Sequence, residues 1–205
     1  MPGEAGGNAE ADSDPDHEAP GPPGSPAYEL RRRVRAWTRS VRATCIPNAQ
    51  ELVKDVDCQV SKRMEFRMQD AQGAVIGLDS LLSLVGENQW VWSVLEFDGI
   101  GTALPGLGYA EIRDRAHSCP QGYVMSWPQV REFAASVQQC FDLLLVAATD
   151  RRALDAQRLA AGDFSECLMV LAAGDSTWWS VEVLTETEVT TGIMERVRAR
   201  YAAAS

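Results

Sequence analysis

Histidine is the side chain that most often serves as a general base, and the chain has only two, His17 and His117. His17 lies in an acidic segment rich in proline and glycine, and His117 lies in the polar stretch DRAHSCPQG. Cys119 is two residues from His117, but neighbours this close in a loop seldom reach the geometry that a nucleophile and its base need. We therefore expect His117 to be a solvent-exposed loop residue, and the sequence assigns no catalytic residue.

Residues 98–108, DGIGTALPGLG, carry glycines at intervals found in phosphate-binding loops. Gly101 and Gly106 have the P-loop spacing, but Leu107 stands where that loop has its lysine. The third glycine of a dinucleotide-binding turn is also missing. The glycines then favour a tight excursion at the end of a strand, near a binding surface. A carboxylate- or metal-dependent enzyme that uses this Asp98–Gly108 loop stays open as an alternative.

Carboxylates are scattered over predicted strand ends and turns. Glu96 and Asp98 end one strand, Asp163 and Glu166 flank the start of another, and Asp175 lies at a hairpin tip. Their spacing matches neither D-x-D-x-D nor H-E-x-x-H. The sequence therefore assigns no metal ligand and no cofactor.

The five cysteines form an odd set without a C-x-x-C pair: Cys45, Cys58, Cys119, Cys140 and Cys167. This pattern argues against a disulfide framework and against a zinc site. It favours a reducing compartment, so we expect a cytoplasmic protein. The acidic, glycine- and proline-rich N-terminus does not match a secretory signal.

Tryptophan and acids occur together in the two best predicted strands, residues 90–97 (WVWSVLEF) and 178–184 (WWSVEVL). If these strands lie near each other, one sheet face presents aromatic rings beside carboxylates. Rigid rings bury a large area at a modest entropic cost, which suits a protein-binding surface. The expected binding residues are Trp90, Trp92, Glu96, Asp98, Trp178 and Glu182.

The formal charge of the chain is −10. Residues 1–26 hold six acids and neither lysine nor arginine, so this segment carries −6 and the rest of the chain −4. Such a balance argues against nucleic acid and against an anionic membrane as partners, and it fits a basic protein partner or simple solubility. The proline- and glycine-rich composition of 1–26 also predicts a disordered tail.

Residues 27–44 read as an amphipathic helix with an apolar stripe of Leu30, Val34, Trp37 and Val41. Five arginines occupy its other faces: Arg31, Arg32, Arg35, Arg39 and Arg42. This cluster is the most basic part of the chain. It is either a solvated helix face, a contact for phosphates, or a partner for the acidic tail or for acids on the domain.

The segment from Ser126 to Ala148 is expected to be a central buried helix, at about 127–148. Ser126, Pro128 and Gln129 form a helix start with an S-x-x-Q capping box. Apolar side chains then recur at helical spacing through Ala148. The polar positions fade after Gln139, which indicates burial on nearly all sides.

The other elements mix strands and helices without βαβ alternation. Strands are expected near 64–68, 74–76, 90–97, 109–112, 122–125, 166–173 and 178–184, and helices near 48–61, 80–85, 151–161 and 188–203. The predicted fold is α+β, with a mainly antiparallel sheet packed against helices, in a single domain at 27–205.

Three functions follow from these observations. The first is a non-enzymatic, acidic, cytosolic domain that binds a basic protein, for example an inhibitor or an immunity protein. The second is a carboxylate- or metal-dependent enzyme at the Asp98–Gly108 loop. The third is a small-ligand regulatory module with a pocket beneath the glycine loop, switched by the tail or by the arginine helix. The oligomeric state is not predicted.

Overall fold

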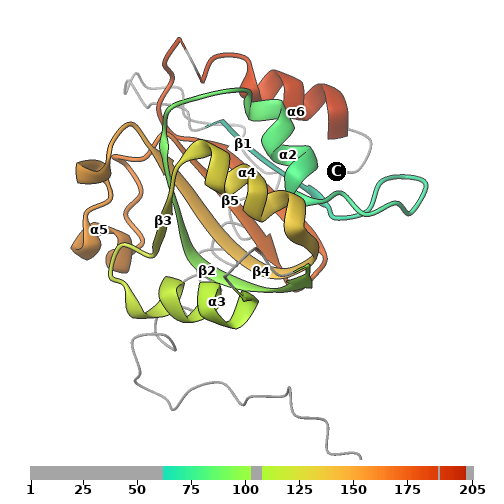
Figure 1. Ribbon diagram of the computed structural model, residues 1–205. Coiled ribbons are helices and arrows are strands. Elements are labelled where there is room, and N and C mark those ends of the chain that lie inside the picture. The colour runs from blue at the N-terminus through green and yellow to red at the C-terminus, as the bar shows by residue number, and fades with distance from the viewer. Residues whose placement is uncertain (1–61, 103–107, 189, 202–205) are drawn as a thin grey trace, which may run out of the picture.

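The computed structural model describes residues 62–102, 108–188 and 190–201 (Figure 1). It confirms the α+β class, since six antiparallel strands pack against helices in the order β1-β6-β5-β4-β2-β3. The strands are β1 (Lys62–Arg67), β2 (Val91–Gly101), β3 (Tyr123–Met125), β4 (Val137–Ala148), β5 (Met169–Gly174) and β6 (Trp178–Val183). The helices are α2 (Leu78–Val85), α3 (Tyr109–Ser118), α4 (Trp127–Ser136), η1 (Arg151–Ala153), α5 (Ala156–Ala161) and α6 (Ile193–Tyr201).

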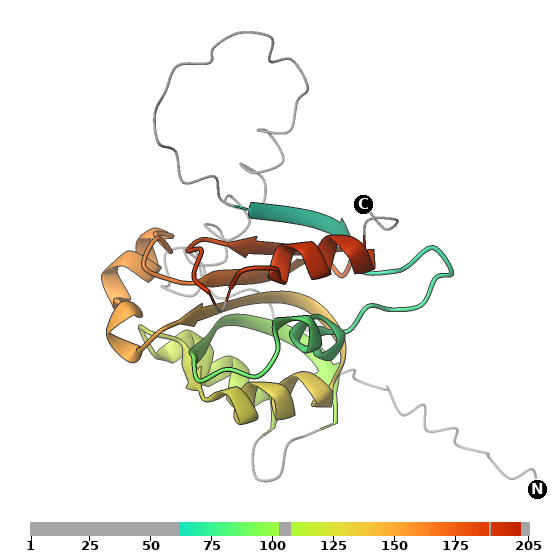
Figure 2. The same ribbon diagram turned by 90° about the horizontal axis from the view of Figure 1, so that it is seen from above.

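The first face of the sheet is covered by α2, α4 and α6, which lie on the same side of the strands (Figures 1 and 2). Large side chains fill this interface. Phe97 packs edge-on against Phe133 of α4, with ring centroids 5.0 Å apart, and Phe66 stacks on Tyr201 of α6 at 4.8 Å. The indole of Trp179 donates a buried hydrogen bond of 2.7 Å to the carbonyl of Ile76. This face carries the main hydrophobic core.

The second face has a smaller apolar cluster, formed over β4 and β5 by the segment that contains η1 and α5. That segment lies at one end of the strands (Figure 2) and contributes Leu154, Leu159, Phe164 and Cys167 to the cluster. No other described helix contributes to it. Toward β1 and β6 this face is polar and charged.

The helix predicted at 127–148 is correct up to Ser136 and wrong beyond it. Its start is as expected, because α4 begins at Trp127 and the backbone N–H of Ser126 donates 2.9 Å to the Gln129 side chain in a capping box. The helix ends at Ser136, however, and residues 137–148 form β4, the strand between β2 and β5. A run that is buried on all sides suits a strand covered on both faces as well as it suits a buried helix, so its periodicity could not separate the two.

Two further predictions near the glycine loop are wrong. Residues 109–112 belong to helix α3, where Ile112 and Ala116 are buried one turn apart. Strand β2 continues through Gly101, so Asp98 lies within a strand. A Cβ at Gly101 would lie 2.5 Å from the Tyr109 hydroxyl, so glycine here allows two segments to approach closely. Residues 103–107 lie outside the described residues.

The predictions for the N-terminal region also lie outside the described residues. They concern the acidic tail at 1–26, the arginine-rich helix at 27–44 and the helix at 48–61. The proposed domain boundary at residue 27 therefore stays a prediction. Among the helices that the structure describes, none is long and apolar enough to cross a membrane.

A substitution at Gly122, the residue before β3, tests how closely the chain packs against β2 at this edge of the sheet. The φ of Gly122 is +73°, and a Cβ there would meet Ser93 Oγ at 2.7 Å and the carbonyl oxygen of Val94. We expect Gly122→Ala to lower the free energy of unfolding by more than about 2 kcal/mol, because the strain of a left-handed alanine adds to the collision. Urea unfolding followed by tryptophan fluorescence measures this change.

Gly73→Ala is the matched control, since Gly73 has a φ of +81° and no atom lies within 4 Å of the place that an alanine methyl group would take. It should cost only about 1–2 kcal/mol, the strain alone. Equal losses for the two variants would contradict the close approach of Gly122 to β2.

Candidate functional site

The strand register arranges the second face in rows of directly opposed residues. One row crosses five strands: Glu65, Ser180, Ala172, Leu144 and Glu96. On one side of it lies a row of Arg63, Glu182, Val170, Val146 and Ser93. On the other side Arg67 opposes Trp178, which opposes Gly174, and Asp142 opposes Asp98. Residues from distant parts of the chain therefore share one surface.

We call this surface the acidic face and define it by five carboxylates with one indole and one hydroxyl: Glu65, Glu96, Asp98, Asp142, Glu182, Trp178 and Ser180. Asp98 is exposed and Asp142 is half-buried, whereas Glu96 is buried. Cross-strand neighbours have Cβ atoms about 5 Å apart, so Asp98 and Asp142 place two like charges side by side.

Cys140 lies on β4, the strand that also carries Asp142, and nearby carboxylates affect the pKa of its thiol. Its pKa is raised above the ordinary value, first by burial and then by the negative charges of Asp142 and Asp98. Both effects disfavour a thiolate, so Cys140 is an inert core residue. The backbone N–H of Asp175 also donates to Asp142 Oδ1 at 3.3 Å, which ties the β5–β6 turn to this group.

The β1–β6 side of the acidic face is held by arginines. Arg63 contacts Glu65 at 2.6 Å and Glu182 at 3.7 Å, and all three side chains are partly buried. The guanidinium of Arg67 lies 5.1 Å from the centre of the Trp178 ring. These contacts pair Glu65 and Glu182 with Arg63 and place a guanidinium group beside Trp178.

Small side chains lie between the two charged sides. We call this part of the sheet, on β5 and β6, the floor of the acidic face; it consists of Ala172, Gly174 and Ser180. Ser180 is 6% exposed, and its hydroxyl oxygen has no hydrogen-bond partner among the described residues. A buried hydroxyl without a partner is unusual and costs about 1–3 kcal/mol, so a polar group that reached Ser180 would recover part of this free energy.

The structure places four of the six expected binding residues on one face of the sheet, on strands β2 and β6. Glu96, Asp98, Trp178 and Glu182 all lie on the acidic face. Trp92 is fully buried on the other side of the sheet, 5.6 Å from the ring of Trp127. Trp90 is 8% exposed and belongs to the same core. The expected approach of the two tryptophan strands does not occur either, because β4 and β5 lie between β2 and β6.

Sequence reasoning missed Asp142 and did not assign Glu65 or Ser180 to the binding residues. Asp142 was hidden because its segment was predicted to be helical. The signal was present in the run from Asp142 through Leu144 to Val146, where alternate residues of a strand share one face and a polar end passes into an apolar one.

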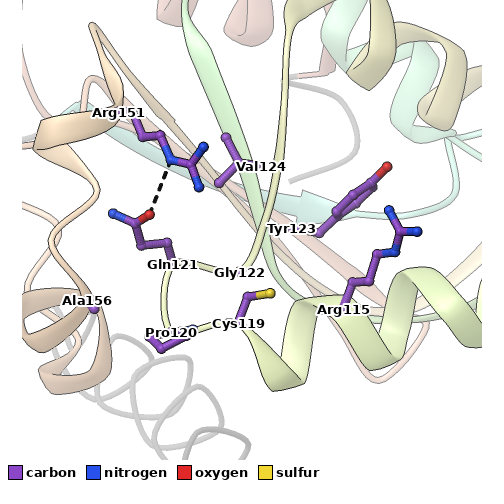
Figure 3. Close-up of a pocket in the computed structure, with 9 residues that line it drawn as sticks. All are labelled: Arg115, Cys119, Pro120, Gln121, Gly122, Tyr123, Val124, Arg151 and Ala156. Atoms are coloured by element: carbon purple, nitrogen blue, oxygen red, sulfur yellow. Dashed lines mark hydrogen bonds between the residues drawn. The ribbon is translucent and has the colours of Figure 1, made fainter.

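A cavity of about 740 Å³ lies between α3, β3 and the η1–α5 segment (Figure 3). Its polar side chains already have partners. Arg115 contacts Glu111 at 2.6 Å and lies 5.5 Å from the Tyr123 ring, and the Nε–H of Arg151 donates to Gln121 at 3.3 Å. Cys119 is an exposed free thiol at its edge. Among the described residues that line the cavity, no carboxylate or histidine is present to act as a base beside this thiol.

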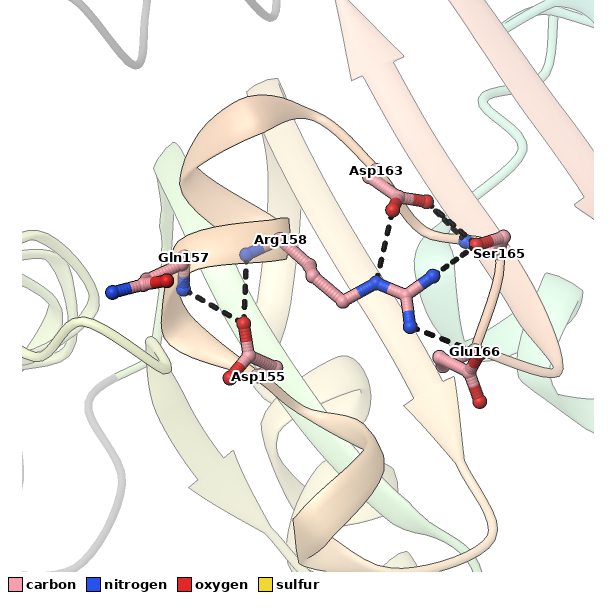
Figure 4. A network of polar contacts seen from close by, with 6 residues as sticks. All are labelled: Asp155, Gln157, Arg158, Asp163, Ser165 and Glu166. Carbon is pink, nitrogen blue, oxygen red and sulfur yellow. Dashed lines mark hydrogen bonds and ion pairs between the residues drawn. The ribbon is translucent and has the colours of Figure 1, made fainter.

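Arg158 fastens the segment that covers the apolar part of the second face (Figure 4). Its Nε and Nη1 contact Asp163 and Glu166, each at 2.9 Å, and its Nη2–H donates to Ser165 Oγ at 2.6 Å. Asp155 begins α5 by accepting hydrogen bonds from the backbone of the next turn. The network positions Phe164 over β4 and β5.

Asp163 makes this network sensitive to acid. Hydrogen bonds from the hydroxyl and backbone N–H of Ser165, followed by Arg158, lower the pKa of Asp163 to about 2 from 3.8. A depressed carboxyl pKa contributes stability above the unfolded pKa and loses it as the pH falls through the folded value. We expect the melting temperature of Asp163→Ala to lie furthest below that of the wild type above about pH 4, and the gap to close toward pH 2.

Thermal unfolding of both chains over this pH range measures the gap. Asp114→Ala, at an exposed position on α3, is the control and should leave only a small difference in melting temperature. A gap for Asp163→Ala that does not change with pH would show that its carboxylate plays no part in fastening the segment.

Among the described residues, no group of three or more His, Cys, Asp or Glu side chains is arranged to hold a metal ion. Comparison with protein-family models, with curated proteins and with solved structures finds no match to this chain. The acidic face itself is therefore the basis for a functional assignment.

Proposed function

We propose that this chain is a protein-binding domain whose acidic face holds an arginine-rich segment of a basic protein. The observation that carries the proposal is the direct opposition of Asp98 and Asp142 beside the buried Glu96. This arrangement concentrates negative charge on one part of the sheet, and a guanidinium group placed against the carboxylates offsets the repulsion between them.

Arginine fits this surface better than lysine does. Its planar guanidinium group donates several hydrogen bonds at once, so one side chain can bridge two carboxylates or reach both a carboxylate and the Ser180 hydroxyl. Arg67 already lies over the Trp178 ring, so this surface holds one contact of the kind that guanidinium groups make with aromatic faces. The partner is therefore a basic protein with clustered arginines.

The overall charge of −10 supports the same role, because it speeds the encounter with a basic partner. A domain that neutralises a basic protein, as an inhibitor or an immunity protein does, matches this chemistry. The three described cysteines, Cys119, Cys140 and Cys167, are free thiols, which fits action in the reducing cytoplasm.

An oligoarginine peptide serves as the probe for this proposal. The chain's own arginines near the N-terminus can compete for any acidic surface, so every chain in the measurement carries Arg31→Gln, Arg35→Gln and Arg42→Gln. In that background we expect Asp98→Asn with Asp142→Asn to weaken binding at least about tenfold, since two charge-assisted contacts are lost. Isothermal titration calorimetry measures the dissociation constants.

The control removes the same two charges elsewhere, through Asp114→Asn on α3 and Glu195→Gln on α6, both exposed positions. It should weaken binding by less than about threefold, the effect of net charge alone. Equal losses in the two double variants would show that the peptide responds to overall charge, and the proposed function would then be wrong.

A further inference from the structure

We infer that residues 27–44 of the same chain occupy the acidic face when no partner is bound. A basic partner must then displace this segment to bind. The inference rests on the proposed function, because it names the competitor and hence the regulation of the same surface. It requires the segment to match the face in charge, in shape and in reach.

The charges are complementary. Residues 27–44 contain six arginines and one acid, Glu29, which gives a formal charge of +5. The acidic face contributes five carboxylates and, within the described part of the sheet, borders two arginines, Arg63 and Arg67. Arg31, Arg35 and Arg42 are four and seven residues apart, so they lie along one side of the predicted helix.

The shapes also match. The helix predicted for 27–44 has a diameter of about 10 Å and a length of about 27 Å. Four strand spacings separate Glu65 from Glu96, a width of about 19 Å. The small side chains of Ala172, Gly174 and Ser180 lie between them, beside the smaller core cluster, which the apolar stripe of such a helix would extend toward β1.

The buried hydroxyl of Ser180 supports an occupant of this face independently of the charges. Ser180 lies in the middle of this floor, is more than nine-tenths buried, and lacks a hydrogen-bond partner among the described residues. A buried hydroxyl without a partner is uncommon, and its oxygen can accept a hydrogen bond from any donor that reaches it. An arginine of a helix seated between Glu96 and Glu65 brings such a donor.

The connection between segment and face is long enough. Residues 45–61, seventeen in number, join the segment to β1, which itself carries Glu65. An extended chain of this length spans up to about 56 Å, well beyond the width of the sheet. Tethering of this kind gives an effective concentration in the millimolar range, so modest contacts suffice to occupy the face.

Hydrogen exchange of the full chain, followed by mass spectrometry, tests the inference. We expect the backbone amides of residues 27–44 to exchange about tenfold or more slowly in the wild type than in the Asp98→Asn, Asp142→Asn variant. The Asp114→Asn, Glu195→Gln control should retain the wild-type protection. Fast exchange in every chain, or protection that survives in the acidic-face variant, would overturn the inference.

Competition gives a second readout. The dissociation constant of the oligoarginine peptide should be about tenfold lower for the Arg31→Gln, Arg35→Gln, Arg42→Gln chain than for the wild type. The matched control is Arg151→Gln, Arg152→Gln, Arg198→Gln, which neutralises three exposed arginines elsewhere and should improve binding much less. Equal improvement in the two triple variants contradicts the inference.

The two proposals can fail separately. If residues 27–44 are unprotected but the acidic-face variant still binds the peptide more weakly than its control, only this inference is wrong. If the acidic-face variant and its control bind the peptide equally, the proposed function itself is wrong.

Discussion

The antiparallel pairing of β4 with β2 and β5 is the constraint on which the rest of the structure depends. A strand in the middle of a sheet is covered on both sides only if two separate layers pack against it. On the first face α2, α4 and α6 supply a continuous apolar layer. On the second face the described apolar layer comes from residues 151–168, fastened by Arg158, and the surface toward β1 is charged.

This division explains why the acidic residues lie together. Asp98 and Asp142 are neighbours because β2 and β4 pair in one register, and Ser180 lies between Glu65 and Ala172 because β6 pairs with both β1 and β5. The arrangement places like charges side by side and buries a hydroxyl, and features of this kind usually reduce the stability of a sheet. Unfavourable features of this kind are common at binding sites. A guanidinium group can compensate both of them, because it is positively charged and donates several hydrogen bonds.

The sequence predicted the fold class and most strands because alternation and turn residues are local signals. The capping box at Ser126 located the start of α4 correctly, but nothing local marked its end at Ser136, since the run after it is apolar on both sides. Because of that error, Asp142 was not among the expected binding residues. Tryptophan alone could not distinguish core from surface: Trp92 is buried under α4, whereas Trp178 lies on the acidic face, and only the strand order separates them.

The central claim is that the acidic face recognises clustered arginine. Titrating the oligoarginine peptide into the ¹⁵N-labelled chain that carries Arg31→Gln, Arg35→Gln and Arg42→Gln, and mapping the amide chemical-shift changes, tests this claim most directly. We expect the largest changes to fall on Glu65, Glu96, Asp98, Asp142 and Ser180. Changes that cluster instead around Cys119 and Tyr123, or along α6, with none on the acidic face, would contradict it.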